Sequence, residues 1–271
     1  MIIKKWVKTN DLITASKLPS ADFVINPYVG CPNACKYCYA SFMKRFTNHS
    51  EPWGEFIDIK ICDKPLETKK LIGKSVFLAS VTDVYNDFEK EYGLTRGILE
   101  QLVGLDIKLS ISTKNDLILR DIDLLKQMKD LTVSFSINTT DENFKNDMDK
   151  ASSIARRMAA MKTLHRNNIK TVCFVSPIFP GITDWKEIIA LTKDFCDEYW
   201  FENLNLRGSY KRAILDYVAD KYPNLVPQYS EIYNKGKQDY WKNLAQEIND
   251  YCNANNIRFV NYFYHEEIKK R

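Results

Sequence analysis

Short apolar runs alternate with amphipathic segments along most of the chain, and this alternation limits the folds open to it. Between the runs, apolar residues recur at helical spacing, as over residues 154–164, and Asp184 followed by Glu187 predicts the N-cap of a further helix. Repeated strand–helix alternation predicts a parallel sheet with right-handed crossovers. We therefore expect an α/β fold, a partial (β/α)6 TIM-like barrel, with strands over residues 22–28, 75–80, 107–112, 131–137, 170–176 and 199–206.

The chain is expected to consist of this barrel and a C-terminal extension. Its 271 residues, of which 45% are hydrophobic, suffice for one α/β barrel with a substantial core. We expect residues 1–206 to form the barrel with an N-terminal lead-in, and residues 207–271 to form a helical extension packed on it. Apolar spacing over residues 240–251 predicts a helix in this extension, and residues 257–264 are expected to form a final strand.

Composition and the N-terminal residues indicate a cytoplasmic protein without membrane association. The N-terminus lacks the apolar segment of a signal peptide, and no apolar run approaches the roughly 20 residues that span a bilayer. Seven cysteines, an odd number without an export signal, argue against a disulfide framework. The net charge of +4, from 39 basic and 35 acidic residues, permits a nucleic-acid partner without requiring one.

Three cysteines lie close together in the segment NPYVGCPNACKYCYA. Structural zinc sites and most iron–sulfur clusters take four protein ligands. Cys31, Cys35 and Cys38 supply three, so either a side chain such as His49 completes a zinc site, or one metal is left without a protein ligand. An open coordination position is useful where a substrate or cofactor must bind the metal. Both alternatives remain at this point.

The spacing Cys-x3-Cys-x2-Cys, with an aromatic residue before the last cysteine, resembles the radical S-adenosylmethionine (SAM) superfamily. The resemblance implies a [4Fe–4S] cluster held by Cys31, Cys35 and Cys38, with SAM bound to the fourth iron. It also implies an external one-electron donor of the flavodoxin or ferredoxin type. The reduced cluster then cleaves SAM to a 5′-deoxyadenosyl radical, which abstracts hydrogen from a substrate. The implied class is a radical SAM enzyme with lyase or transferase chemistry.

Five further segments resemble the branch of this superfamily that contains spore photoproduct lyase and the radical SAM mobile-pair or DNA repair photolyase-like proteins. They are SVTDVYNDFEKEYGLTR (80–96), STKNDLILRD (112–121), VSFSIN (133–138), ASSIARRM (151–158) and PIFPGITD (177–184). The branch implies a nucleic acid, nucleotide or nucleoside as substrate and a paired radical SAM protein as partner. The alternatives are modification of a peptide or partner protein, and a non-enzymatic metal-bearing interaction module.

The resemblance assigns SAM-binding roles to polar residues that follow two predicted strands. It places Thr82 and Asp83 at the ammonium group of SAM, and Lys114 at its carboxylate. The alternatives are that Asp83 is a helix N-cap and that Lys114 is an ordinary surface lysine.

Three more residues are implied in SAM binding. The resemblance places Tyr37 against the adenine, and Ser136 and Asn138 near the ribose hydroxyls. The alternative for each is a buried residue that only completes the barrel. Arg157 matches an arginine of the family, but Arg157 and its neighbour Arg156 also fit a solvated helix face.

On the substrate side, the resemblance assigns Tyr39 and Ser80 as catalytic residues. Tyr39 follows the last cysteine and is expected to face the substrate. Ser80 stands where spore photoproduct lyase carries the cysteine that returns a hydrogen atom to its substrate radical. A serine O–H bond is too strong to give up hydrogen readily, so we expect different chemistry. Trp53, in the loop that follows the cysteines, is expected either to meet substrate or to pack over the barrel rim.

Overall fold

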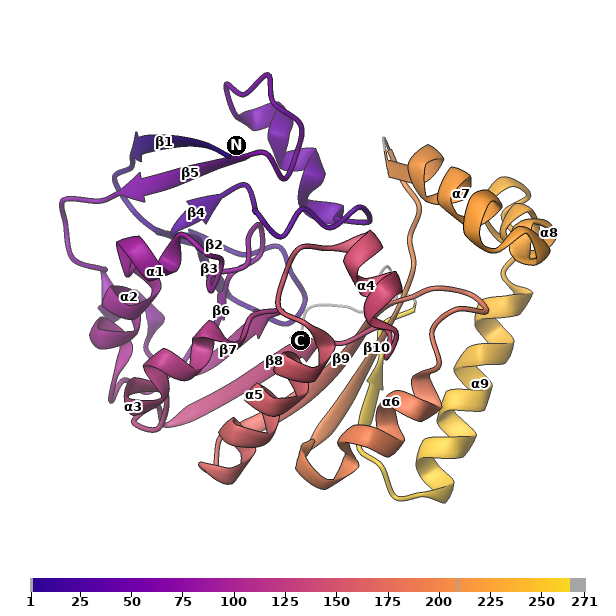
Figure 1. Cartoon of the computed structure of the whole chain (residues 1–271). Helices are drawn as coiled ribbons and strands as arrows, with labels where there is room; N and C mark the ends of the chain where they lie inside the picture. Colours follow the sequence, from indigo (N-terminus) through magenta and orange to yellow (C-terminus); the bar gives the residue numbers. More distant parts are fainter. Residues whose placement is uncertain (1, 209, 264–271) are drawn as a thin grey trace.

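The computed structural model describes residues 2–208 and 210–263, and its main feature is a sheet of eight strands (Figure 1). These strands are β2 (Ile13–Ala15), β3 (Phe23–Ile25), β6 (Ser75–Leu78), β7 (Lys108–Thr113), β8 (Asp130–Ser136), β9 (Lys170–Ile178), β10 (Glu198–Asn203) and β11 (Phe259–Asn261). Their spatial order is β11-β10-β9-β8-β7-β6-β3-β2. Every neighbouring pair from β3 to β11 is parallel, whereas β2 is antiparallel to β3.

The sheet confirms the predicted partial barrel. Within the described residues β2 and β11 are the two edges and do not pair with each other, so the barrel is open. Because the chain steps from each parallel strand to its neighbour, the carboxyl ends of these strands lie along one edge of the sheet, where barrel enzymes place their sites. The predicted final strand corresponds to β11; Tyr264, its last predicted residue, lies outside the described residues.

The crossover helices cover the outer face of the sheet (Figure 1). Helix α5 (Ile154–Arg166) buries Ile154 and Leu164, as the helical spacing predicts. Helix α6 (Trp185–Thr192) begins at Asp184, whose carboxylate accepts the Glu187 N–H at 2.9 Å, so the predicted N-cap is confirmed. The other described helices before residue 206 are α1 (Glu89–Tyr92), α2 (Leu94–Leu102), α3 (Ile122–Leu125), α4 (Glu142–Met148) and the 3₁₀ helices η1 (Tyr39–Phe46), η2 (Thr68–Leu71), η3 (Asp116–Asp121) and η4 (Lys193–Phe195).

A second, three-stranded sheet was not predicted from the sequence. β1 (Ile3–Lys8) pairs in parallel with β5 (Phe56–Ile61), and β5 pairs antiparallel with β4 (Tyr28–Val29). The predicted strand over residues 22–28 is therefore divided between the two sheets. The division falls at Pro27, which has no N–H to give to a strand ladder. The small sheet matters because β4 leads directly into the cysteine segment.

The C-terminal extension contributes one strand and several helices. These helices are α7 (Tyr210–Lys221), η5 (Pro223–Leu225), α8 (Val226–Tyr229), the π-helix η6 (Ser230–Asn234) and α9 (Asp239–Ala254). The ring of Tyr251 on α9 meets Trp185 of α6 edge-on at 5.3 Å, and β11 extends the main sheet beside β10. Among the described residues, no helix has the length and apolar character needed to cross a membrane.

Candidate active site

The three cysteines lie in a tight loop between β4 and η1. Gly30 opens the loop with a φ of 88°, and a Cβ atom added there would lie 2.5 Å from the Phe56 carbonyl oxygen. Only glycine fits this position. Farther along, the Cys38 N–H donates to the Cys35 carbonyl at 3.1 Å, so the loop turns back on itself just before η1.

A cavity of about 220 Å³ opens beside this loop at the carboxyl ends of the strands. The predicted site residues that line it are Cys31, Cys35, Tyr37, Cys38, Tyr39, Ser80, Thr82, Asp83, Lys114 and Ser136. Asn138 is not among the described lining residues. Strand β8 ends at Ser136, so the rule that residues two apart share a face of the strand does not extend to Asn138. The buried Asn138 side chain instead donates to the Pro177 carbonyl at 3.3 Å.

The donor set fits a cluster better than a single metal ion. Within the described residues, no three His, Cys, Asp or Glu side chains converge on a point that one ion could occupy. Both ring nitrogens of His49 are already engaged, Nδ1 with Glu51 at 3.0 Å and Nε2 with Asp58 at 2.8 Å. This arrangement contradicts the zinc site completed by His49. A cluster of several irons does not require its thiolates to meet at one point.

The surroundings of the thiols also suit a metal-bound state. Burial raises the pKa of the Cys31 thiol to about 12 and raises the pKa values of Cys35 and Cys38, so metal binding must remove their protons. The buried indole N–H of Trp53 has no well-aligned hydrogen-bond acceptor among the described residues. Its interaction with the Cys38 sulfur lowers the pKa of that thiol, against the larger effect of burial. A donor whose nearest use is a sulfur fits a thiolate ligand.

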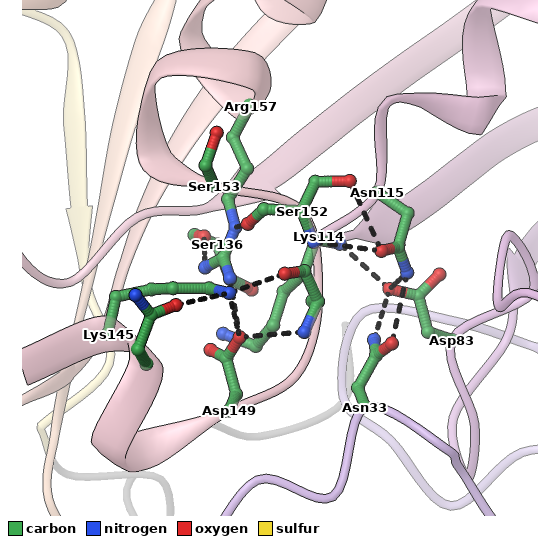
Figure 2. A network of polar contacts seen from close by, with 12 residues as sticks. Asn33, Asp83, Lys114, Asn115, Ser136, Lys145, Asp149, Ser152, Ser153 and Arg157 are labelled. Carbon is green, nitrogen blue, oxygen red and sulfur yellow. Dashed lines mark hydrogen bonds and ion pairs between the residues drawn. The ribbon is translucent and has the colours of Figure 1, made fainter. Parts of the chain in front are cut away.

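Asp83 connects the cysteine loop to the end of β7 (Figure 2). Its carboxylate accepts five hydrogen bonds of 2.8–3.0 Å, from the N–H groups of Tyr85 and Lys114, the hydroxyl of Thr113 and the side-chain amides of Asn33 and Asn115. Burial raises the pKa of Asp83, while the Lys114 N–H and the Thr113 hydroxyl act to lower it. Five donors already exceed the roughly four lone-pair positions of a carboxylate, so the implied contact with the SAM ammonium group would have to share an oxygen with them.

A second buried carboxylate, Asp149, lies on the other side of Lys114 (Figure 2). It accepts hydrogen bonds from Arg157 at 2.6 Å and from the Tyr37 hydroxyl at 3.3 Å. Arg157 is fully buried and also donates to the Ser136 carbonyl at 3.1 Å, whereas Arg156 is exposed. The solvated interpretation therefore holds for Arg156 alone. Sequence reasoning missed Asp149, and no pattern around it could have identified its partner.

Lys114 is the one cation among the described residues that line the cavity. Its amine donates to the Tyr37 hydroxyl at 3.2 Å and lies 5.4 Å from the centre of that ring. The Tyr37 ring meets Phe179 edge-on at 5.5 Å, which fixes its orientation. Nearby, the Thr82 hydroxyl donates to the Gly30 carbonyl at 2.8 Å. The wall can thus offer a positioned ammonium group to an anion such as a carboxylate.

The wall made by β9, β10, the loop after β10 and α7 contains residues that sequence reasoning did not assign. They include Phe174, Ser176, Glu202, Asn205 and Tyr210. Ser176 donates a hydrogen bond to Glu202, and across the cavity Tyr39 donates one to the Ser80 carbonyl. The positions of Ser176 and Glu202 near the carboxyl ends of their strands could have identified them, by the rule that was applied to Lys114.

Comparison with known proteins places these features in a family. The model of the Radical SAM superfamily matches residues 25–192. An uncharacterized protein of Methanocaldococcus jannaschii is 40% identical over 230 residues, which cover 84% of this chain and 86% of that protein. An uncharacterized protein of Mycobacterium tuberculosis is 26% identical over 245 residues, which cover 84% of this chain and 71% of that protein.

Solved structures share the fold. Spore photoproduct lyase complexed with dinucleoside spore photoproduct superposes with a TM-score of 0.60 at 20% identity, covering 81% of this chain and 66% of the lyase chain. SuiB of Streptococcus suis bound to S-adenosylmethionine gives a TM-score of 0.54 at 17% identity, covering 88% of this chain and 49% of SuiB. This chain therefore spans less than two thirds of the length of either neighbour. It belongs to the radical SAM superfamily and is a radical SAM enzyme, with a [4Fe–4S] cluster and S-adenosylmethionine as its cofactors.

Proposed function

We propose that this radical SAM enzyme acts on a nucleic acid, a nucleotide or a nucleoside. The observation that carries the proposal is the two-sided cavity. One part of the lining holds the cysteines, Tyr39, Asp83 and Lys114, and the part contributed by β9 and α7 presents the rings of Phe174 and Tyr210. Aromatic rings stack on any nucleobase. The fold likeness to spore photoproduct lyase, solved with a dinucleoside photoproduct, supports the same substrate class.

In this proposal the two sides of the cavity have separate tasks. Cys31, Cys35 and Cys38 hold the cluster, and Lys114 pairs with the carboxylate of SAM. Asp83 keeps the cysteine loop and the end of β7 in register through its hydrogen bonds to Asn33 and Lys114. When bound, the cofactors supply a 5′-deoxyadenosyl radical that abstracts hydrogen from the substrate. The residues of the chain bind, orient and exclude side reactions.

With Ser80 at this position, the last step of the proposed reaction differs from that of an enzyme in which a cysteine returns a hydrogen atom to the substrate radical. The Ser80 N–H donates to the Asn26 side chain at 3.0 Å, which fixes Ser80 at the cavity wall. Apart from the three cysteines of the loop, no cysteine lines the cavity among the described residues. A hydroxyl does not give up a hydrogen atom readily, so we infer that the substrate radical is resolved without a thiol from this wall.

A second candidate function is modification of a peptide or partner protein. The observation that favours it is Glu202, whose carboxylate lines the cavity and would pair with a cationic side chain. Both candidates need an external one-electron donor, for which a flavodoxin or ferredoxin is proposed. A paired radical SAM protein is a further proposed partner.

The test is the yield of 5′-deoxyadenosine from anaerobically reconstituted protein supplied with dithionite and SAM. We expect single-stranded DNA, RNA or nucleosides to raise this yield, and a new product to appear in the added nucleic acid. Cys35→Ala, which removes one proposed cluster ligand, should form no 5′-deoxyadenosine with any addition. If peptides that contain lysine or arginine raised the yield of 5′-deoxyadenosine and no nucleic acid or nucleoside did, the second candidate function would replace the proposal.

A further inference from the structure

Helix η1 carries an exposed aromatic surface that extends beyond the cavity. Phe42, Phe46 and Tyr39 are 46%, 67% and 60% exposed. The guanidinium carbon of Arg45 lies 5.4 Å from the ring centre of Phe42 and 4.7 Å from that of Phe46. We call these four residues the aromatic ridge. Single exposed apolar residues are common on folded proteins, but here two rings lie against one arginine, and Tyr39 lies one 3₁₀ turn before Phe42. Such a grouping is typical of an interaction site.

The geometry of η1 connects the aromatic ridge to the cavity. In a 3₁₀ helix, residues three apart lie directly above one another, so Tyr39, Phe42 and Arg45 form one row and Phe46 adjoins its end. Tyr39 also lines the cavity and donates a hydrogen bond to the Ser80 carbonyl. The aromatic ridge therefore begins at the cavity and continues outward along η1.

The aromatic ridge and its surroundings carry positive charge. Arg45 forms no ion pair with any other residue in 2–208 or 210–263, so its guanidinium is available to an anion. Lys44 donates to the Ser50 carbonyl at 3.0 Å, and Lys5 of β1 donates to the Asn48 carbonyl at 3.2 Å. A carbonyl oxygen does not neutralise the Lys44 amine, which therefore adds to the potential that attracts a polyanion, whereas the charge of Lys5 is partly offset by Glu51.

We propose that the aromatic ridge binds single-stranded nucleic acid and leads one nucleotide into the cavity. Bases stack on Phe42 and Phe46, and Arg45 holds the phosphate between them. Tyr39 stands at the point where the next base leaves the aromatic ridge for the cavity. A duplex cannot use this surface in the same way, because its bases are already paired and stacked. The inference rests on the proposed function and specifies which form of nucleic acid the enzyme binds.

The test is fluorescence anisotropy of a labelled oligothymidine titrated with the iron-loaded protein under anaerobic conditions. We expect Phe42→Ala and Phe46→Ala each to weaken binding about tenfold, which is typical for loss of one stacked base. Arg45→Ala should lower the slope of log affinity against log salt by about 0.7, as for one single-strand phosphate contact. Phe46→Tyr keeps a ring and should restore the affinity. The matched control is Leu191→Ala on α6, which removes an apolar side chain that is 50% exposed and should leave binding unchanged.

Iron content and circular dichroism verify that each variant is folded. An affinity within about twofold of wild type in the Phe42→Ala, Phe46→Ala double variant would overturn the proposal. Tighter binding of a duplex than of the single strand would also overturn it. Self-association of the protein that depends on Phe42 and Phe46 would overturn it too, because the surface would then bind a second copy of the chain. If oligonucleotide binding depended on the aromatic ridge, but added nucleic acid did not change the yield of 5′-deoxyadenosine, only the proposed function would be refuted. If the protein converted nucleosides, but the substitutions in the aromatic ridge left oligonucleotide affinity unchanged, the proposed function would stand and only the proposed role of the aromatic ridge would be refuted.

Discussion

At the scale of single residues, Lys114 serves the cavity with two separate groups. Its backbone N–H donates to Asp83 at 2.8 Å, and its side-chain amine donates to the Tyr37 hydroxyl at 3.2 Å. The main-chain contact does not depend on the side chain, so the amine can be removed without releasing Asp83. This separation makes Lys114 a suitable residue for testing the cofactor assignment.

We expect Lys114→Ala to weaken SAM binding by about tenfold or more, because a hydrogen bond to a charged group contributes about 1.5–3 kcal/mol. Iron content should not change, since Lys114 makes no hydrogen bond to the three cysteines and its charge lowers the pKa values of Cys35 and Cys38 only against the larger effect of burial. Anaerobic equilibrium binding and iron analysis measure both quantities. Lys150→Ala is the control: Lys150 is exposed, and it contacts the cysteine loop through its backbone N–H, at 2.7 Å from the Asn33 carbonyl. If Lys114→Ala bound SAM like wild type, Lys114 would have no part in the cofactor site.

Gly30 gives a prediction for the cysteine loop. In Gly30→Ala, the new methyl group would lie 2.5 Å from the Phe56 carbonyl oxygen, in addition to the strain of a positive φ. The loop must shift, so we expect less iron per chain and a free energy of unfolding lower by about 1–3 kcal/mol. Gly104→Ala is the matched control, since its φ is also positive, at 74°, but nothing lies within 4 Å of the added carbon. Equal losses in both variants would mean that strain alone, without the clash, explains the effect.

At the scale of elements, one arginine joins two helices of the barrel wall. Arg96 on α2 donates to Asp121 at 3.0 Å and to Asp123 of α3 at 2.7 Å. The hydrogen bond from Arg96 lowers the pKa of Asp123 to about 2 from its usual 3.8. A carboxyl whose pKa is lower in the folded state stabilises the fold above its unfolded pKa, and this contribution disappears as the pH falls through the folded pKa.

Asp123→Asn should therefore lower the free energy of unfolding at pH 6 by a small amount, because the pair is exposed and screened by salt. The difference between the variant and wild type should shrink as the pH falls from about 4 toward about 2. Urea unfolding over this pH range measures it. A difference that stayed constant with pH would show that the carboxylate charge of Asp123 contributes nothing.

The elements also show what sequence patterns can and cannot predict. Helix α6 was foreseen because its N-cap and its apolar spacing are local properties of the chain. β1 was missed because all six of its residues are exposed, so it has no buried face to produce an alternation. Pro27 divides a continuous apolar run between two sheets, and no count of apolar residues reveals such a division.

The candidate site follows the same division between local and distant information. The cysteine spacing and the strand ends are local, and they led to the residues that line the cavity. Arg156 and Arg157 are adjacent and identical in type, and only the position of distant Asp149 distinguishes the buried one. The contact between Asn33 and Asp83 joins residues fifty positions apart, which one sequence does not reveal.

At the scale of the whole molecule, the C-terminal extension and the barrel share one sheet, since β11 pairs with β10. Trp241 of α9 is 2% exposed and meets Phe263 edge-on at 5.3 Å. We expect Trp241→Ala to lower the free energy of unfolding by about 3–5 kcal/mol while unfolding remains a single transition. Trp6→Ala, at a position that is 56% exposed, should cost less. Urea unfolding followed by circular dichroism measures both, and a separate early transition would make the extension an independent domain.

The hydrogen bonds of Asp83 have a consequence for how the enzyme matures. Asn33 stands between the first two cysteines, and the carboxylate that holds it also holds the backbone of Lys114. Iron uptake that orders the cysteine loop should therefore also order Lys114, where the carboxylate of SAM is proposed to bind. By thermodynamic reciprocity, the cofactor should stabilise the metal to the same degree. The cluster and SAM would then bind cooperatively rather than independently.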